Sequence, residues 1–341
     1  MSRALRLAIV GCGAIVEYGY LVAARAVAGL DVTALVDIDM ARAERLARQF
    51  AVPTVLTDLR RLPQDVGGVL IAVPHHLHAP MAVECLQRGL AVLVEKPLAL
   101  TAAGAQEVVE TARRQGVVLQ AAQTYRFCRG AQAVKRVLED GWLGSLQSVH
   151  VEGNFADTLP LASGFCWNRE HAGGGILMDV GTLVLDLLAW WLGKLDVVEY
   201  YDDSLGGVEA ECDLRLVARR PEGSVPVRVR MSRLRPLHDW VVLRGRQFSL
   251  RYGLQAKQGE VQLQVGDDGE YAFALDGGRQ STLDLFAEQL RSFKAAAAAG
   301  EPVSDAEAAV RVLELIETCY GRRRSLGYPW LPAGLLALAG R

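Results

Sequence analysis

The sequence has no large excess of charge of either sign. Its 37 lysine and arginine residues face 39 acidic residues, which gives a formal net charge of -2. Such a chain has no basic field with which to attract nucleic acid or anionic lipid, so we expect neither as a partner. The six cysteines are scattered, without a C-x-x-C pair or a metal-ligand spacing. This pattern favours reduced thiols in a cytoplasmic protein.

Long hydrophobic runs are also missing. No apolar stretch reaches the length of a transmembrane helix without interruption, so we expect no membrane span. The apolar run near the N-terminus ends in glycines and Glu17, and it reads as a first strand and turn rather than as a signal peptide. The apolar segment LPAGLLALAG (331–340) is too short to cross a bilayer, and we expect it to pack on a surface or a subunit partner.

The chain itself is long enough for two domains. Its 341 residues exceed what one ordinary hydrophobic core holds, and the pattern changes near residue 122. We therefore expect a dinucleotide-binding domain at 1–122 and a substrate-binding and oligomerisation domain at 123–341.

The first domain alternates short apolar runs with helical patterns, which indicates a parallel sheet covered on both faces. The predicted strands are 5–10, 31–36, 68–73, 91–96 and 117–122, and the predicted helices are 15–28, 40–50, 78–88 and 101–115. Thr101 is the expected N-cap of the last of these helices, and Gly116 is its expected end.

The second domain begins with a predicted helix at 130–140 and a strand. From 195 to 275 the sequence alternates polar and apolar residues over several short stretches, as an antiparallel sheet with one face in water would. Two helices, near 281–299 and 304–323, close the pattern. The fold class is thus α/β, with an N-terminal Rossmann domain and a C-terminal domain that carries a large, mostly antiparallel sheet.

A glycine turn follows the first predicted strand. Gly11 allows the tight turn, and Gly13 lets the backbone approach a pyrophosphate at the start of a helix. Ala14 and Ile15 continue this turn and belong to the expected cofactor site. The third fingerprint position is Val16, where glycine or alanine is usual, so the fingerprint is incomplete. Taken alone, the turn could equally be an ordinary strand-to-helix connection.

An acidic residue at the end of the second strand strengthens the cofactor hypothesis. Asp37 stands where a carboxylate binds the ribose hydroxyls of a dinucleotide. The same carboxylate would repel a 2′-phosphate, so we expect NAD as cofactor, with NADP possible but weaker. The alternative for Asp37 is a turn or helix-capping role.

Three histidines follow the next strand in the segment AVPHHLHAP. They invite a metal site, but no cysteine or carboxylate stands nearby to complete one, so we expect no metal. We expect Val73, Pro74, His75 and His78 to line the cofactor crevice at the carboxyl edge of the sheet.

The segment VLVEKPLAL places a lysine at that same edge. Glu95 and Lys96 end a predicted strand, where ligands bind in open α/β sheets. A lysine there can donate a proton or a hydrogen bond to a substrate oxygen. The alternative is a solvated surface lysine, which the strand end and the following proline disfavour.

The segment GGGILMDVGTLVLD reads as one buried helix from Gly173 to Asp186, yet it contains Asp179 and Asp186. A buried carboxylate is costly unless it is paired and hydrogen-bonded. Two of them on a core helix therefore call for partners.

With these segments together, the chain resembles the glucose–fructose oxidoreductase, inositol dehydrogenase and MocA (Gfo/Idh/MocA) family. The resemblance rests on GCGAI, AVPHHLHAPMAVECLQRGLAVLVEKPLAL, YRF with LEDGWLGSLQSV, GGGILMDVG through LDLLAWWLG, and the last two helices. It implies an NAD(P)-dependent oxidoreductase that oxidises a secondary alcohol of a sugar or polyol, or reduces the matching ketone. It also implies a homodimer or homotetramer formed through the C-terminal sheet.

The family helix usually reads D-x-G-x-H-x-x-D, so that an aspartate and a histidine share one face. Here Asp179, Gly181 and Asp186 match, but the histidine position is Leu183, which can neither donate nor accept a proton. We expect Lys96, held by Asp179, to act as the acid/base, and Leu183 to line the substrate pocket. The alternative is that Leu183 is a core residue and that Asp179 only caps or braces the loop. Tyr125 is a second candidate proton donor, or else a core residue.

Another expected substrate segment is FCWNREH, which precedes the helix. Trp167, Arg169 and His171 offer an aromatic ring, a cation and an imidazole that suit a hydroxylated or acidic ligand. His171 could also supply the missing imidazole. The bland alternative is a solvent-facing loop with one anchoring tryptophan.

The sequence thus predicts hydride transfer between a nicotinamide cofactor and a sugar-like or small carbonyl or secondary-alcohol substrate. Ketone reduction fits a lysine acid more readily than alcohol oxidation does. Two alternatives stay open: a cofactor-binding protein without turnover, and an enzyme that uses NAD transiently for elimination or hydrolysis.

Overall fold

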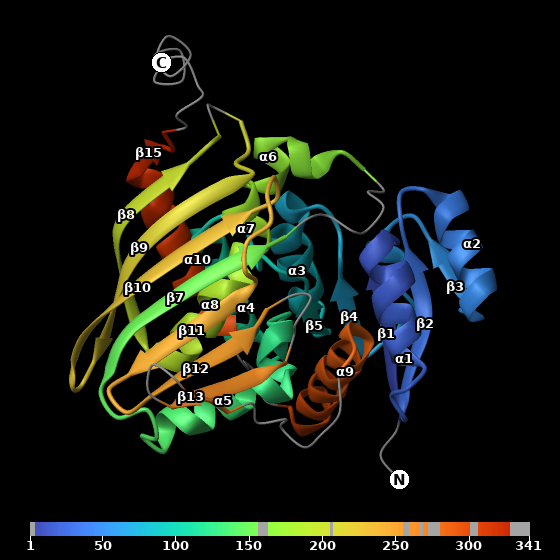
Figure 1. Ribbon diagram of the computed structural model, residues 1–341. Helices are drawn as coiled ribbons and strands as arrows, with labels where there is room; N and C mark the ends of the chain where they lie inside the picture. Colours follow the sequence, from blue (N-terminus) through green and yellow to red (C-terminus); the bar gives the residue numbers. More distant parts are fainter. Residues whose placement is uncertain are drawn as a thin grey trace.

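The computed structural model describes residues 4–155, 163–204, 207–254, 259–265, 269–271, 280–300 and 306–327. Two sheets dominate the molecule, a smaller one in the N-terminal half and a broad one that curves beside it (Figure 1). The predicted segment 331–340 lies outside the described residues.

The first sheet contains six strands, in the order β3-β2-β1-β4-β5-β6, and every neighbouring pair is parallel. The strands are β1 (Leu5–Val10), β2 (Leu30–Val36), β3 (Thr54–Leu56), β4 (Gly68–Ile71), β5 (Ala91–Val94) and β6 (Leu119–Ala121). This is the order of a dinucleotide-binding Rossmann sheet, so the predicted fold class is confirmed. In this sheet, only β3 lacks a counterpart among the predicted strands.

Helices cover both faces of this sheet. They are η1 (Val16–Tyr20), α1 (Leu21–Ala24), α2 (Met40–Phe50), η2 (Leu59–Arg61), η3 (His75–Leu77), α3 (His78–Gln87) and α4 (Ala102–Gln115). Successive strand residues therefore enter two separate cores: Val69 and Ile71 pack in one, and Leu70 packs in the other. The caps predicted for α4 are confirmed, since the Thr101 hydroxyl accepts from the Gly104 amide and Gly116 takes a left-handed conformation.

The helix predicted at 15–28 is shorter than expected. It opens with the π-helical turn η1 and ends at Ala24 in α1. The reason lies in the next strand, because β2 begins at Leu30, which pairs with Leu5. The chain must therefore reverse its direction before residue 30 and cannot continue as a helix.

The second sheet contains nine strands, in the order β14-β13-β12-β11-β7-β10-β9-β8-β15. They are β7 (Leu146–Asn154), β8 (Lys194–Asp202), β9 (Glu211–Arg220), β10 (Gly223–Ser232), β11 (Trp240–Gly245), β12 (Phe248–Gly253), β13 (Val261–Val265), β14 (Gly269–Tyr271) and β15 (Arg323–Ser325). The sheet is mostly antiparallel, as expected, but β7 with β10 and β8 with β15 are parallel pairs.

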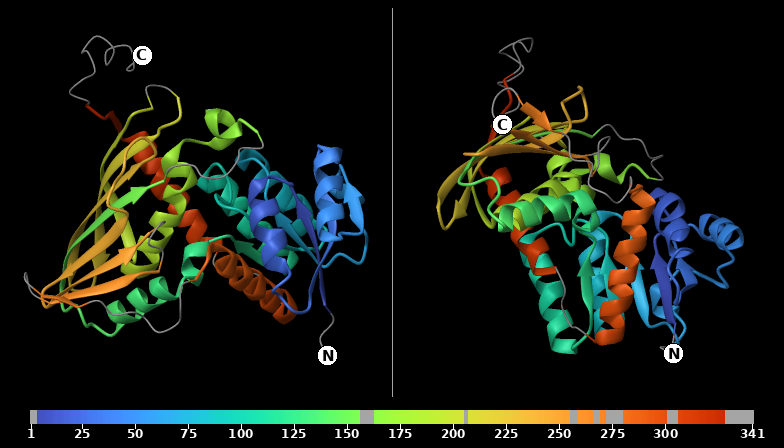
Figure 2. Two further views of the ribbon diagram at one scale, coloured as in Figure 1. Left: turned by 45° about the vertical axis from the view of Figure 1, so that its right-hand side comes forward. Right: turned by 60° about the horizontal axis from the view of Figure 1, so that its bottom comes forward.

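Helices pack on the inner face of this sheet and against the first sheet (Figure 2). They are η4 (Thr124–Phe127), α5 (Arg129–Glu139), η5 (Phe165–Trp167), α6 (Arg169–Ala172), α7 (Ile176–Asp179), α8 (Gly181–Leu192), α9 (Thr282–Ala299) and α10 (Ala306–Gly321). Across the described ranges no single helix has the length and apolar character of a membrane span; only the bent α6–α7 and α8 pair passes that test.

The last helices return to the N-terminal half of the chain. In α9, Leu290 and Phe293 belong to the second core of the first sheet, and the Phe286 ring lies 4.7 Å from the Tyr20 ring. In α10, the Glu317 carboxylate accepts from the Ala102 amide at 2.9 Å. A domain division at residue 122 therefore stays a prediction, and α9 packs across it.

Candidate active site

The glycine turn at the end of β1 has two differently constrained glycines. Gly11 has φ +94, and a Cβ there would lie 2.2 Å from the Ala72 carbonyl oxygen, so the fold itself requires glycine. A Cβ on Gly13 would meet nothing within 4 Å. The space beside Gly13, at the start of the η1 helix, is therefore open to a ligand, and a pyrophosphate fits that position. Ala14 and Ile15 line this turn and are partly buried.

The residue at the third fingerprint position explains why the motif departs from the usual pattern. Val16 is fully buried in the second core of the first sheet. In other Rossmann folds, glycine or alanine at this position allows the helix to pack closely on the strand. Here the branched side chain of Val16 fills that space in the core.

Asp37 directly follows β2, and its carboxylate accepts hydrogen bonds from nearby backbone amides. Its carboxylate accepts from the amides of Cys12 at 2.7 Å and Asp39 at 2.8 Å. Arg42 lies 3.5 Å from the same carboxylate and also pairs with Asp39. Asp37 thus joins the glycine turn to β2, at the edge where a ribose would lie.

The three histidines after β4 are held by backbone carbonyls and rings. His75 Nδ1 lies 2.9 Å from the Ala172 carbonyl, and His78 contacts the carbonyls of Pro97 at 2.6 Å and Val73 at 2.8 Å. Burial lowers the pKa of His75 to about 3 and the pKa of His78 to about 4. Both imidazoles are therefore neutral near pH 7, and they tie Val73 and the η3 turn that follows Pro74 to neighbouring segments.

The segment that carries Trp167, Arg169 and His171 folds over this turn. The His171 ring stacks on His76 with centroids 4.3 Å apart, and the Arg169 guanidinium lies over the Tyr320 ring at 5.8 Å. Trp167 is 63% exposed in η5. The structure therefore places the His171 imidazole in a stack with His76. Among the described residues no group of three histidine, cysteine or acidic side chains has the geometry of a metal site.

Glu95 is buried beneath the site rather than exposed in it. Its carboxylate accepts from the Tyr20 hydroxyl at 2.5 Å and from the Lys96 amide at 3.0 Å. Tyr20 in turn accepts from Gln289 of α9 at 2.7 Å. Burial raises the pKa of Glu95. This chain of polar contacts fixes the backbone from which the Lys96 side chain projects.

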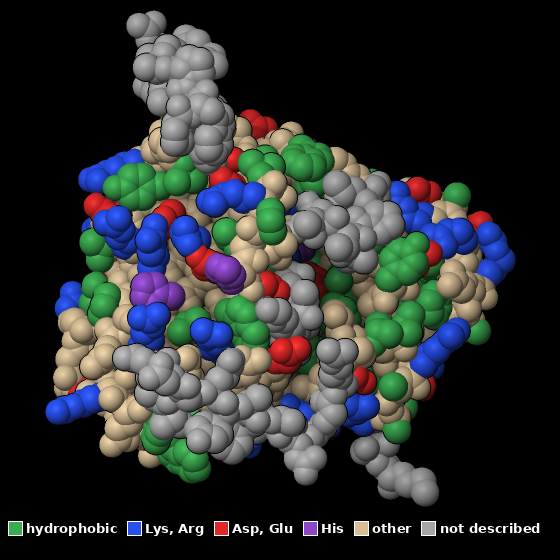
Figure 3. Space-filling view, in the orientation of Figure 1, with side chains coloured by type: hydrophobic (Ala, Val, Ile, Leu, Met, Phe, Trp, Pro, Cys, Tyr) green, Lys and Arg blue, Asp and Glu red, His purple; other side chains and the backbone are tan. Residues whose placement is uncertain are grey.

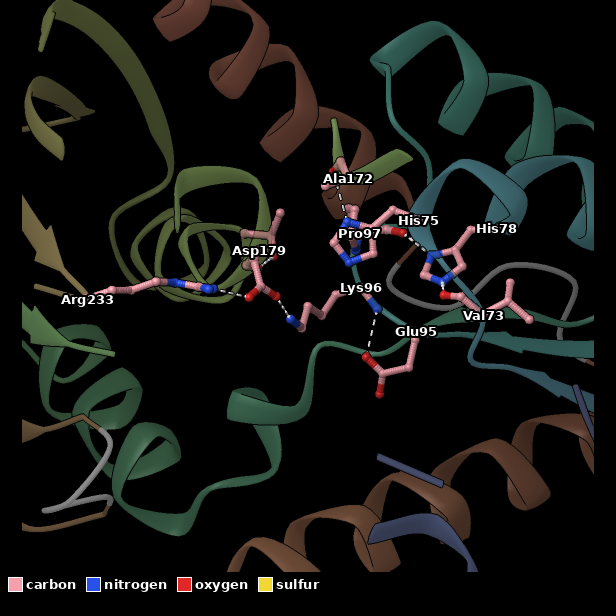
Figure 4. A network of polar contacts seen from close by, with 10 residues as sticks. Val73, His75, His78, Glu95, Lys96, Pro97, Ala172, Asp179 and Arg233 are labelled. Atoms are coloured by element: carbon pink, nitrogen blue, oxygen red, sulfur yellow. Dashed lines mark hydrogen bonds and ion pairs between the residues drawn. The ribbon is translucent and has the colours of Figure 1, made fainter. Parts of the chain in front are cut away.

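Lys96, which follows β5, meets Asp179 at the end of α7 (Figure 4). The Lys96 ammonium donates to Asp179 Oδ1, and the Arg233 guanidinium donates to Asp179 Oδ2. The three side chains are 22%, 28% and 13% exposed, respectively. Although burial opposes ionisation, the cations of Lys96 and Arg233 hold the pKa of Asp179 well below its usual value. Asp179 is therefore a carboxylate near neutral pH and has no proton to donate there.

The helix that carries Asp179 is broken, which corrects the expectation of one helix from Gly173 to Asp186. α7 ends at Asp179 and α8 begins at Gly181, and the segment Arg169–Asp179 meets α8 at an angle of 46°. A Cβ on Gly175 would lie 1.9 Å from the Glu209 carbonyl oxygen. Glycine at this position therefore lets the start of α7 pack directly against the backbone of Glu209, which precedes β9. Glu209 then accepts from the amides of Ile176 and Leu177.

The remaining residues of the helix motif are Leu183 and Asp186. Leu183 is 9% exposed and lies outside the core cluster that contains its neighbours Val184 and Leu185, among the residues that the structure describes. Asp186 accepts two hydrogen bonds of 2.7 Å from Arg126 and is 2% exposed. The second aspartate is thus a buried structural ion pair, while the first belongs to the site.

Tyr125 lies in η4, partly buried against the main core. Arg233 is the site residue that sequence reasoning missed. It follows β10, 54 residues from Asp179 in the sequence, and no motif marks it. The only available signal was the need of a buried carboxylate for cations.

Two family models match this chain, one in each of its halves. The GFO_IDH_MocA model, described as an oxidoreductase family with an NAD-binding Rossmann fold, matches residues 5–123, and the GFO/IDH/MocA C-terminal domain model matches residues 131–250. Together these models cover well over half of the chain.

Two relatives illustrate the sequence similarity. The trans-1,2-dihydrobenzene-1,2-diol dehydrogenase of Mus musculus is 34% identical over 193 residues, which are 56% of this chain and 57% of that protein. The dTDP-3,4-didehydro-2,6-dideoxy-alpha-D-glucose 3-reductase of Streptomyces antibioticus is 33% identical over 198 residues, 56% of this chain and 58% of that protein. The matches thus span only a little more than half the length of these relatives.

Solved structures extend the likeness of the fold to nearly the whole chain. A 3-ketoreductase from Actinomadura kijaniata, in complex with NADP and TDP-benzene, is 23% identical with a TM-score of 0.84, over 96% of this chain and 100% of that one. A levoglucosan dehydrogenase in complex with NADH and levoglucosan is 19% identical with a TM-score of 0.80, over 94% of this chain and 98% of that one.

Proposed function

The chain belongs to the Gfo/Idh/MocA family, and from this premise we propose that it is an NAD(P)-dependent oxidoreductase acting on a hydroxylated, sugar-like substrate. The relatives include both a dehydrogenase and a 3-reductase, so the reacting group is a secondary alcohol or the matching ketone. We propose reduction of the ketone as the favoured direction, because the site offers a lysine as acid and no neutral histidine on the helix.

The residues around the glycine turn fit a dinucleotide. A Cβ on Gly13 would extend into open space at a helix start, where a pyrophosphate finds backbone N–H donors. Asp37 would hold the adenosine ribose, and the η3 turn with Pro74 and His75 would line the nicotinamide side of the crevice. A bound nicotinamide supplies or accepts the hydride.

Proton transfer to the substrate is the step that residues of this chain perform. Lys96 projects from the carboxyl edge of the parallel sheet, and its ammonium can donate a proton to a carbonyl oxygen as that oxygen gains charge. Asp179 holds the ammonium in place and stays ionised. Leu183, 9% exposed, offers no proton, and we propose that it lines the substrate pocket.

The single observation that carries the proposal is the contact of Lys96 with Asp179 at the edge where Rossmann sheets bind their ligands. The segment with Trp167, Arg169 and His171 supports a hydroxylated substrate, since rings and cations of this kind bind sugar-like molecules.

A substrate panel tests the proposal. Keto-sugars, sugars and polyols are offered with NAD, NADH, NADP and NADPH, and the absorbance of the reduced nicotinamide is followed. We expect consumption of reduced cofactor with at least one keto-sugar. Gly13→Val is the matched control: its side chain meets no protein atom within 4 Å of the Cβ, so it should fold yet lose cofactor binding and turnover.

Two outcomes of the panel would contradict the proposal. Tight cofactor binding without turnover on any member would indicate a binding protein. Conversion of a substrate without net change in the cofactor would indicate an enzyme that oxidises and re-reduces its substrate around an elimination or hydrolysis step.

A further inference from the structure

We propose that Glu209 and Tyr320 are positioning residues that hold the Asp179 carboxylate in place by fixing the start of helix α7. This role deepens the proposed function and rests on it for the effect on turnover. The fixing of α7 itself needs no substrate and can be measured on the free protein.

Helix α7 is too short to define its own position. It has four residues, Ile176–Asp179. A single turn is unstable alone, because it restricts the backbone for very few hydrogen bonds. Its N-cap residue is Gly175, which has no side chain to accept from the first amides. Other parts of the chain must therefore accept from these amides and set the direction of the turn that ends at Asp179.

Glu209 supplies both acceptors at the start of this turn. Its backbone carbonyl accepts from the Ile176 amide at 2.8 Å, and its carboxylate accepts from the Leu177 amide at 3.0 Å. The Glu209 side chain is only 4% exposed. Glu209 thus takes the place of an N-cap residue, although it lies 32 residues beyond Leu177 in the sequence.

Tyr320, near the end of α10, orients that carboxylate. Its hydroxyl donates to Glu209 Oε1 at 2.8 Å, and the same oxygen accepts from the Leu177 amide. The Tyr320 ring also contacts the Tyr200 ring, with centroids 5.9 Å apart, and the Arg169 guanidinium at 5.8 Å. The Glu209 carboxylate therefore has a donor outside α7 that keeps it directed at the first amides of the helix.

The glycines before α7 leave room for these two residues. A Cβ on Gly174 would clash with the Tyr320 hydroxyl, and a Cβ on Gly175 would clash with the Glu209 carbonyl. Each of these glycines thus admits one of the two positioning residues to the start of α7.

The same helix, α10, contacts the segment that follows Lys96. Glu317 stands three residues before Tyr320 and so lies on the same side of α10. Its carboxylate accepts at 2.9 Å from the amide of Ala102, the residue at which α4 begins. α10 therefore connects the segment that carries Lys96 with the helix that carries Asp179, and it sets the position of one relative to the other.

Loss of the Tyr320 hydroxyl should loosen α7 and, with it, the contact between Asp179 and Lys96. The Glu209 carboxylate would be free to turn away from the Leu177 amide. Since proton transfer depends on the position of the Lys96 ammonium, turnover should fall. Cofactor binding should stay intact, because it depends on the glycine turn at the end of β1.

Hydrogen–deuterium exchange on the free protein tests the fixing of α7. Tyr320→Phe removes the hydroxyl and keeps the aromatic ring. Mass spectrometry should show exchange about fivefold faster in the peptide that covers 174–180, the scale for loss of one hydrogen bond, and unchanged exchange in β5. Glu209→Met, of similar length but without an acceptor, should give at least the same increase. Tyr201→Phe is the matched control, since its hydroxyl contacts only the exposed Arg324, at 3.3 Å, among the described residues, and it should exchange like the wild type.

Turnover then shows whether the effect reaches the site. On the substrate found in the panel, Tyr320→Phe should lower kcat by about tenfold or more, with an unchanged dissociation constant for the cofactor. Tyr201→Phe should turn over like the wild type.

Each other outcome decides between the two proposals. If α7 exchanges faster in Tyr320→Phe but no protein turns over any substrate, wild type included, the proposed function fails and the fixing of α7 by Glu209 and Tyr320 stands. Wild-type exchange in α7, or wild-type turnover despite faster exchange, would overturn the positioning role. A loss of cofactor binding in step with turnover would indicate general destabilisation and would overturn it as well.

Discussion

At the scale of single residues, the site differs from its family pattern at one helical position. Leu183 stands four residues after Asp179, where the family histidine would share its face. The charge around Asp179 is instead completed by Lys96 and by Arg233 from the second sheet. Among the residues that the structure describes, Lys96 is the hydrogen-bond donor that the Rossmann half brings to the Asp179 carboxylate.

Leu183→His tests whether this arrangement has replaced the histidine. If Leu183 is a wall of the pocket, an imidazole there loses fit and exposes a polar group to a desolvated site, at a cost of about 1–3 kcal/mol if it stays unpaired. We expect lower turnover on the native substrate in the panel assay. Leu183→Met, apolar and of similar volume, should stay active. A gain of NAD-linked oxidation that the wild type lacks would instead indicate a lapsed dehydrogenase.

Asp37 gives a second prediction at this scale. The carboxylates of Asp37 and Asp39 both pair with Arg42. A 2′-phosphate at this position would therefore meet two carboxylates and an arginine that is already paired. We expect NAD to bind more tightly than NADP. Asp37→Ser should narrow the ratio of the two dissociation constants by about tenfold, which corresponds to about 1.4 kcal/mol of lost repulsion. Titration of both cofactors measures this, with Asp31→Ser at the far end of β2 as control. A wild-type preference for NADP would refute the role of Asp37.

At the scale of elements, the sequence predicts regular segments well and their interruptions poorly. The strands at 5–10 and 68–73 and the caps of α4 were predictable, because apolar runs and capping residues act locally. The start of α7 at Ile176 was not, since Glu209, which is distant in the sequence, accepts hydrogen bonds from the amides of Ile176 and Leu177. Arg233 was missed for the same reason: its partner lies in another element.

His75 of the η3 turn and His78 at the start of α3 make the fold sensitive to acid. Burial lowers the folded-state pKa of His75 to about 3 and of His78 to about 4, whereas an unfolded chain binds these protons near pH 6.5. The unfolded state thus gains protons first as the pH falls, and stability decreases below pH 6.5. Between pH 6.5 and about pH 5 we expect the free energy of unfolding to drop by about 3 kcal/mol.

Urea unfolding at the two pH values measures this drop. His78→Asn should reduce the pH dependence, because one of the two titrating groups is gone. His238→Asn, in which the replaced side chain is 87% exposed, should leave it unchanged. A free energy of unfolding that stays flat over this range would contradict the neutral, buried state of these histidines.

At the scale of the whole molecule, the second sheet presents a face of alternating charges. Figure 3 shows basic side chains among acidic ones over its strands. Arg228 pairs with Asp213, and Arg215 pairs with Glu199, between neighbouring strands. Assembly into a dimer or tetramer through this face stays a prediction. If it occurs, charges meet across the interface, and the association constant should fall as salt shortens the screening length.

Sedimentation velocity at low and high salt checks this expectation. We expect an oligomer at low salt that dissociates in part at about 1 M salt, where the Debye length is about 3 Å. Arg228→Glu, on the sheet face, should weaken it, and Arg60→Glu, on the first sheet's surface, should not. A monomer under all conditions, or an assembly that does not respond to either variant, would refute assembly through this face.

The account as a whole depends on Lys96 as the proton donor. The most direct measurement is turnover of Lys96→Ala on the substrate found in the panel, with cofactor affinity measured beside it. We predict that turnover falls by a factor on the order of 10² or more, the scale for loss of a general acid, while NAD binding stays largely intact. Lys194→Ala, which removes a lysine that is 79% exposed, should turn over like the wild type. Near-wild-type turnover in Lys96→Ala would contradict the account and move the proton chemistry to Tyr125 or His171.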